Sequence, residues 1–203
     1  MYFDPQVISQ KERYKLTTGS VLPRPIAWVS SMDLDGNLNL APYSFFTCVS
    51  TDPLILLFAP QSPEAGAQKD SYYNVLEVGE FVINIVDEET AVAMSKSAVG
   101  LPRGESEFAY AGVTPAPSEK VGVPRVAEAP VAFECSLQQV VTFNSAKKGG
   151  GAAVFGLVEN IYVRDDVYHP EKGYIMLDKL RPIGRLSGNG YVHVNDVFEL
   201  ERG

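Results

Sequence analysis

The chain has only two cysteines and two histidines among its 203 residues. Cys48 and Cys135 lie far apart, each in an apolar run, so their spacing suggests neither a disulfide framework nor a metal site. We expect two reduced thiols in a reducing compartment. His169 and His193 are also isolated, and a lone histidine is more often a surface or core residue than a ligand. The sequence therefore predicts no metal centre.

The usual catalytic motifs are also missing. We find no G-x-S-x-G elbow, no Walker A sequence and no G-x-G-x-x-G that opens a helix after a strand. The glycine-rich loop at 144–151 resembles a phosphate cradle, but it lies between two predicted strands, so no helix dipole would face a bound anion. A hairpin tip is the better interpretation. Covalent hydrolase chemistry is disfavoured, and we assign no catalytic side chain.

Membrane-length apolar runs and a long basic stripe are absent as well. The net charge is −8, which repels polyanions, and no basic stripe follows the chain. The apolar stretches are too short to cross a bilayer, and residues 1–6 do not resemble a signal peptide. We expect a cytoplasmic protein without nucleic-acid or membrane partners. Its length and 45% hydrophobic content fit one domain over 1–203.

What the chain does contain is a series of β-type segments. Six strands are predicted, at 26–31, 43–49, 54–58, 80–86, 131–143 and 152–163, which suggests an antiparallel barrel or sandwich. An Asp35-Gly36 turn joins the first two strands, and Pro42 predicts an irregular start to the second. Helices are predicted at 70–78, with Asp70 as N-cap and Gly79 as the stop, and at 88–99. The proline-rich segment 102–130 reads as a long ordered excursion.

Three segments between residues 24 and 74 carry the most specific signal. The first strand ends in two hydroxyls, and Pro42 frees backbone groups close to Ser44, so these groups could read a polar heterocycle. Lys69-Asp70-Ser71 opens a helix, where free N–H groups and the dipole favour an anion. Each feature alone has an ordinary structural explanation, as a strand-end hydroxyl, a turn, a cap or a surface charge. Together they indicate an anion plus a ring.

A set of ordered motifs then carries a resemblance. They are R-P-I-A-W-V-S-S at 24–31, D-L-D-G-N-L-N-L-A-P-Y-S-F-F at 33–46, D-P-L-I-L-L-F at 52–58, K-D-S at 69–71, G-E-F-V-I-N at 79–84 and P-I-G-R-L-S-G-N-G-Y at 182–191. From Leu22 to Tyr191 the chain resembles the flavin reductase-like, FMN-binding split-barrel family. The resemblance implies a mainly β, six-stranded antiparallel split barrel of Greek-key character with a few short helices. It also implies a homodimer with FMN at the subunit interface.

The resemblance further implies site residues by position. The strand end at 28–31 and the strand start at 41–45 look like the segments that line the isoalloxazine and ribityl chain, and 69–71 looks like the phosphate group's partner. Many relatives have threonine where this chain has Ser71, which keeps the hydroxyl. The full predicted cofactor-binding set is Arg24, Trp28, Val29, Ser30, Ser31, Ala41, Pro42, Tyr43, Ser44, Phe45, Lys69, Asp70, Ser71, Asn74, Arg185 and Tyr191.

Three functions remain open from the sequence. The first is an NAD(P)H-dependent flavin reductase or related oxidoreductase, in which hydride reaches the flavin N5 by proximity and stacking, without a protein base. The second is an FMN-binding electron carrier that lacks nicotinamide activity and takes electrons from a partner protein. The third is a split barrel that has lost flavin and serves as an interaction module. The acidic charge barely separates them.

Overall fold

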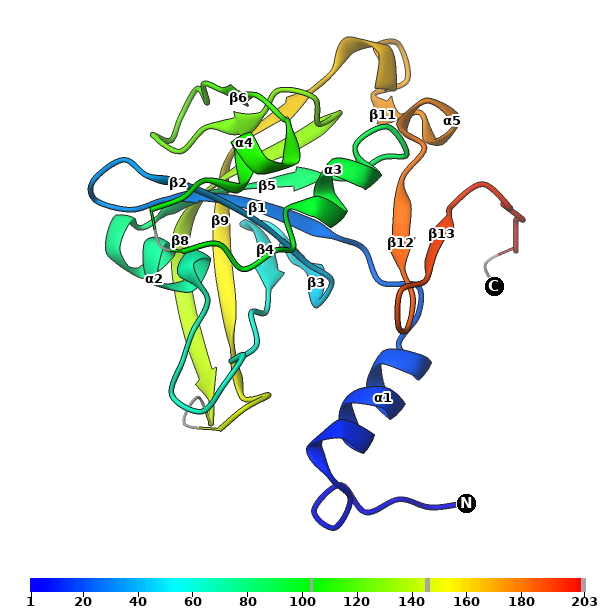
Figure 1. Ribbon diagram of the computed structural model, residues 1–203. Helices are drawn as coiled ribbons and strands as arrows, with labels where there is room; N and C mark the ends of the chain where they lie inside the picture. The colour runs from blue at the N-terminus through cyan, green and yellow to red at the C-terminus, as the bar shows by residue number, and fades with distance from the viewer. Residues whose placement is uncertain (103, 145–146, 202–203) are drawn as a thin grey trace.

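The computed structural model describes residues 1–102, 104–144 and 147–201. Its centre is a seven-stranded antiparallel sheet with the order β2-β1-β5-β8-β9-β4-β3 (Figure 1). The strands are β1 (Ala27–Met32), β2 (Leu38–Tyr43), β3 (Phe46–Thr51), β4 (Leu54–Phe58), β5 (Glu80–Ile85), β8 (Val131–Phe143) and β9 (Gly151–Val163). The mainly β prediction is confirmed. The count of six was wrong, because the predicted strand at 43–49 covers the end of β2 and the start of β3.

The two edge strands of this sheet are consecutive in the chain. β2 and β3 are separated only by the bend at Ser44 and Phe45, yet they stand at opposite ends of the strand order. The sheet must therefore curl until its two edges meet at this bend, which makes an incompletely closed barrel. No glycine or proline marks the bend, so the apolar run through it gave no turn signal.

The β1–β2 hairpin forms as predicted, but Pro42 does not disturb it. Gly36 has a φ of 85°, which the turn requires. The register is continuous from Ala27 opposite Tyr43 to Met32 opposite Leu38, so the predicted irregularity was wrong. The Leu40 amide points away from β1 and donates to Glu107. Two residues further on, the nitrogen of Pro42 faces the same outer edge, where its missing N–H costs no ladder bond.

The core has an apolar cluster on each face of β1. Ala27 and Val29 pack with Phe58 and Phe81, whereas Trp28 packs with another set that includes Met94. Because β1 is paired with β2 on one side and β5 on the other, it is buried on both faces and both edges. This explains the continuous apolar run that begins the strand.

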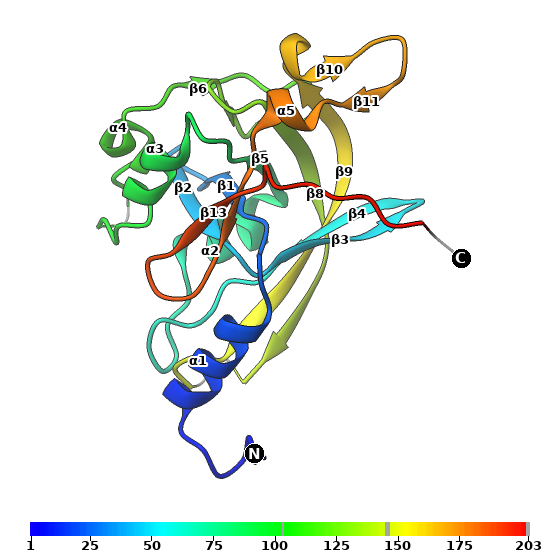
Figure 2. The ribbon, with the colours of Figure 1, turned by 90° about the vertical axis from the view of Figure 1, so that its right-hand side faces the viewer.

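The helices differ in part from the sequence prediction. α2 (Asp70–Val78) ends at Gly79 as expected, but its N-cap is Lys69, not Asp70. The predicted helix at 88–99 was too long, because an Asp87–Thr90 hydrogen-bonded turn delays α3 (Ala91–Lys96). Sequence reasoning missed α1 (Gln10–Ser20), although Ser9 and Glu12 form a capping box before it. In Figure 1, α1 lies to one side of the sheet, and in the view of Figure 2 it overlaps the lower ends of β8 and β9.

The ordered excursion is confirmed over residues 104–130, and residue 103 lies outside the described residues. The excursion contains α4 (Glu107–Ala111), β6 (Pro115–Ala116) and β7 (Arg125–Val126). Fully buried Glu134 accepts hydrogen bonds from the amides of Glu119 and Lys120, which ties this segment to the sheet. The chain continues through η1 (Asp165–Val167), β10 (Tyr168–His169), β11 (Tyr174–Ile175), α5 (Leu177–Leu180), β12 (Ile183–Arg185) and β13 (Tyr191–His193). In the described ranges, no helix is long and apolar enough to span a membrane.

Candidate functional site

Three hollows meet around Pro42 at the outer edge of β2, and together we call them the Pro42 groove. The helix-side hollow, of about 100 Å³, is lined by Asn39, Ala41, Pro42, Tyr43, Lys69, Asp70, Ser71, Glu107 and residues 97–101. The bend hollow, of about 280 Å³, is lined by Tyr14, Pro42, Tyr43, Ser44, Phe45, Ala59, Gln61 and Lys69. The arginine hollow, of about 150 Å³, is lined by Ile26, Pro42, Ser44, Met94, Ala98, Arg185 and Tyr191.

Unused backbone donors surround the middle of this groove. At the bend, the amides of Ser44 and Phe45 form no hydrogen bond within the described part of the chain. At the start of α2, Lys69 makes no capping bond, and the amides of Asp70 and Ser71 likewise have no acceptor among the described residues. Open amides at a helix N-terminus attract anions. Two separate sets of open amides therefore belong to residues that line one groove.

The charges of the groove differ between its helix side and its bend side. Lys69 lines both the helix-side and bend hollows, and its ammonium is unpaired among the residues that the structure describes. Asp70 and Glu107 line only the helix-side hollow. Burial raises the pKa of Glu107, with a further rise from Asp70, against the lowering effects of the Leu40 amide and Lys69. An anion held by Lys69 at the start of α2 therefore lies near two carboxyl groups, and the pKa of one of them is raised.

Arg24 acts behind the groove and does not line it. Its buried guanidinium donates to the carbonyls of Thr18, Val21 and Leu186 at 2.9 to 3.0 Å. Its Nε donates to the Ser44 hydroxyl at 3.2 Å. Burial lowers the pKa of Arg24. The residue therefore joins the end of α1 and the segment after β12 to the bend, and it holds the Ser44 hydroxyl in place.

The predicted residues of β1 do not reach the groove. Trp28 lies in the core and donates its Nε1–H to Ser97 at 2.8 Å, which anchors the 97–101 segment beside the helix-side hollow. Val29 is buried in the other cluster. Ser30 donates to the Pro124 carbonyl, and Ser31 accepts from Asn74. The hydroxyls that seemed free at the strand end serve internal contacts, and the ladders on both sides use the strand's amides.

The other predicted residues do converge. Those that line the groove are Ala41, Pro42, Tyr43, Ser44, Phe45, Lys69, Asp70, Ser71, Arg185 and Tyr191. The hydroxyls of Tyr43 and Ser71 are hydrogen-bonded to each other, and burial raises the pKa of Tyr43. Sequence reasoning missed Tyr14, Gln61 and Glu107. These residues come from α1, the chain after β4 and the 104–130 excursion, so no local sequence motif connects them with the other site residues.

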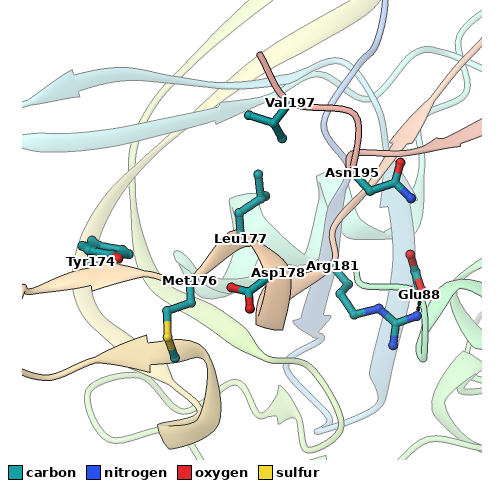
Figure 3. A pocket seen from close by; sticks show the side chains of 8 residues that line it. All are labelled: Glu88, Tyr174, Met176, Leu177, Asp178, Arg181, Asn195 and Val197. Atoms are coloured by element: carbon teal, nitrogen blue, oxygen red, sulfur yellow. Dashed lines mark hydrogen bonds and ion pairs between the residues drawn. The ribbon is translucent and has the colours of Figure 1, made fainter. Parts of the chain in front are cut away.

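A larger hollow lies elsewhere, between α5 and the C-terminal segment (Figure 3). It has a volume of about 630 Å³. Its Arg181 already pairs with Glu88, which also contacts His193 Nδ1 at 2.7 Å. None of the predicted site residues lines it. Its one arginine is already paired with Glu88, whereas the Pro42 groove has unpaired donors, so we place the candidate site at the groove.

The fold and the groove together define a class: a curled antiparallel sheet whose two edges meet at a ligand-sized, donor-rich bend. Residues 18–181 match the family described as the flavin reductase like domain, and the chain belongs to that family of flavin-related oxidoreductases.

Solved structures agree with the family assignment. Nitrilotriacetate monooxygenase component B from Bacillus cereus is 37% identical, with a TM-score of 0.93 and 98% of each chain covered. The 2-nitrobenzoate 2-nitroreductase NbaA from Pseudomonas fluorescens is 32% identical, with a TM-score of 0.89, covering 100% of this chain and 96% of that one. A protein with a split barrel domain from Shewanella frigidimarina, at 18% identity, TM-score 0.84 and full coverage of both chains, shows the fold alone. The split-barrel prediction is confirmed.

Proposed function

We propose that the protein binds FMN in the Pro42 groove and acts as an NAD(P)H-dependent flavin oxidoreductase. The observation that carries this proposal is the convergence of Lys69 with the open amides of Ser44, Phe45, Asp70 and Ser71. Such a donor set fits one phosphate and the polar edge of a ring. FMN has one phosphate, and hollows of about 100 to 280 Å³ suit it better than a dinucleotide flavin.

In this proposal the protein binds and orients, and no side chain is assigned a catalytic step. Lys69 and the first amides of α2 hold the phosphate, and the amides at the bend face the ring. Arg24 positions the Ser44 hydroxyl, and the Tyr43–Ser71 contact fixes the floor beneath Lys69. A bound flavin would accept hydride from a nicotinamide and pass the electrons to an acceptor.

We also propose a cytoplasmic homodimer. The C-terminal segment exposes three large apolar side chains, Val197, Phe198 and Leu200, with 63%, 79% and 79% of their surfaces accessible. A contiguous exposed apolar segment suits burial against a second copy. Sedimentation of the purified protein tests this directly, and a monomer at all concentrations would contradict it.

The function is tested by the spectrum of the protein after loading with FMN and desalting. We expect a retained flavin absorption band with quenched fluorescence. Rapid mixing with NADH or NADPH should then bleach that band. Absence of the band removes FMN binding and leaves an interaction module. A band that neither nicotinamide bleaches makes the protein an electron carrier that needs a partner protein.

Glu107 predicts how FMN binding depends on pH. Because burial raises the pKa of Glu107, its carboxyl ionises only above the ordinary range, next to Asp70 and Lys69. As pH rises through this pKa, the new negative charge weakens binding of the phosphate. We expect Glu107→Gln to flatten the decline, since the amide oxygen still accepts from Leu40. Titrations of both proteins with FMN and with riboflavin, at a series of pH values above the ordinary carboxyl range, check this. Parallel curves for both proteins would contradict it.

A further inference from the structure

The arginine hollow is not needed to hold the phosphate of FMN. Five of its seven lining residues, Ile26, Pro42, Met94, Ala98 and Tyr191, present apolar or aromatic surface. The two polar ones are Ser44 and Arg185, and no carboxyl group lines the hollow. The chain as a whole has 25 acidic residues and 17 basic ones. A hollow that is lined by an arginine and by no carboxyl group therefore differs in charge from the protein as a whole.

Both polar groups have donor capacity left. Ser44 accepts from Arg24 Nε, and its own hydroxyl hydrogen has no acceptor within the described ranges. Arg185 lies with its guanidinium carbon 4.5 Å from the centroid of the Tyr191 ring and donates one hydrogen bond to the Gly188 carbonyl. A guanidinium has five N–H groups. Arg185 has no carboxylate partner among the residues that the structure describes.

The positions of these groups are fixed by the fold. Arg185 and Tyr191 are opposite each other in the β12–β13 pair, so the register of two short strands sets their stacking. The buried Arg24 guanidinium, which donates to Ser44, adds positive charge close to the hollow. It also donates to the carbonyl of Leu186, the residue that follows Arg185. Met94 and Ile26 are fully or nearly buried and form a rigid apolar floor.

We propose that the arginine hollow binds the carboxylate of a small aromatic acid. Arginine offers two parallel N–H bonds to a carboxylate, and the Ser44 hydroxyl can supply a third donor. The aromatic ring of the acid packs against Tyr191, Pro42 and Met94. A volume of about 150 Å³ lies well below the roughly 300–1,000 Å³ of sites for larger ligands, so it accepts a single ring.

The hollow shares Pro42 and Ser44 with the bend hollow, so the acid would lie beside the ring of a bound flavin. This placement rests on the proposed function, whereas binding of the acid itself does not. The lining of the hollow thus favours one class of second ligand for the groove: a planar monocarboxylate rather than a free phosphate or a dinucleotide.

Calorimetric titration with benzoate tests the proposal, on flavin-free and on FMN-loaded protein. We expect saturable binding to both forms, with benzamide and inorganic phosphate each at least tenfold weaker than benzoate. Arg185→Gln should weaken benzoate binding by about tenfold or more, and by more than it weakens FMN binding. Arg185→Lys should lie between, since it keeps the charge but loses the paired bonds. Arg125→Gln is the matched control, because Arg125 also stacks on a tyrosine, Tyr162, away from the groove.

Several results would overturn the proposal. Phosphate binding as tightly as benzoate would make this a general anion site, and displacement of benzoate by NADH from flavin-free protein would assign the hollow to the dinucleotide. Displacement of FMN by benzoate would assign it to the flavin. Loss of benzoate binding in Arg125→Gln would show a non-specific effect. If benzoate binds but FMN does not, the proposed function fails while the aromatic-acid site stands.

If Arg185→Gln does not fold, as judged by circular dichroism, Ser44→Ala replaces it. That variant should weaken benzoate at least threefold, and unchanged affinity would count against the proposal.

Discussion

Replacing Lys69 with methionine should weaken FMN binding by about 10- to 100-fold while changing riboflavin binding less than about twofold. A charged hydrogen bond contributes roughly 1.5–3 kcal/mol, which corresponds to this range. Lys69 is exposed and unpaired within the described ranges, so its loss leaves no buried partner behind. Fluorescence titration of both flavins at one ionic strength gives the comparison, because riboflavin differs from FMN by the phosphate alone.

Lys179→Met is the matched control for Lys69, since Lys179 is an exposed lysine outside the groove. Added salt should weaken FMN binding to the wild type more than to Lys69→Met, because screening acts on the charge that the variant lacks. Equal losses for FMN and riboflavin would move the phosphate site away from Lys69. Ser71 is a poorer target for this test, because its removal also deprives the buried Tyr43 hydroxyl of its partner.

The strands could be predicted where the sequence pattern is local. Alternation and apolar runs identified β4, β5, β8 and β9 closely, and the Asp35-Gly36 pair identified the first hairpin. The bend at Ser44 was missed because a single serine is a weak turn signal inside an apolar run that predicts a continuous strand at 43–49. Pro42 was misjudged for a different reason: a proline disturbs a strand only if its nitrogen faces a neighbour, and that depends on which strand forms the edge of the sheet.

The site could be predicted only where its residues belong to local sequence motifs. Lys69, Ser44 and Arg185 were found through motifs, and the structure places all three on the Pro42 groove. Ser30 and Ser31 looked equivalent to Ser44 in sequence, but a serine's hydroxyl faces a ligand or a buried carbonyl according to tertiary contacts alone. Glu107 approaches the groove through its bond to Leu40, 67 residues earlier in the chain, and no local pattern announces such a contact.

Replacing Arg24 with methionine should lower the free energy of unfolding by about 3 kcal/mol. Methionine fills the volume of the stem but leaves the carbonyls of Thr18, Val21 and Leu186 without their charged donor. Unsatisfied buried acceptors cost roughly 1–3 kcal/mol each, offset in part because the variant no longer buries a charge. Urea denaturation followed by circular dichroism measures the change. Arg164→Met is the control, since Arg164 forms an ion pair with exposed Asp166 and should cost less than about 1 kcal/mol.

Arg24→Lys separates charge from geometry at the same position. One ammonium cannot reach three carbonyls and the Ser44 hydroxyl together, so the variant should recover only part of the lost stability. If Arg24 positions Ser44, both variants should also weaken FMN binding when measured well below their unfolding midpoints. Wild-type stability of Arg24→Met would show that the three carbonyls find other donors. Normal FMN affinity in a folded Arg24→Met would show that Arg24 is not needed to position Ser44 for FMN binding.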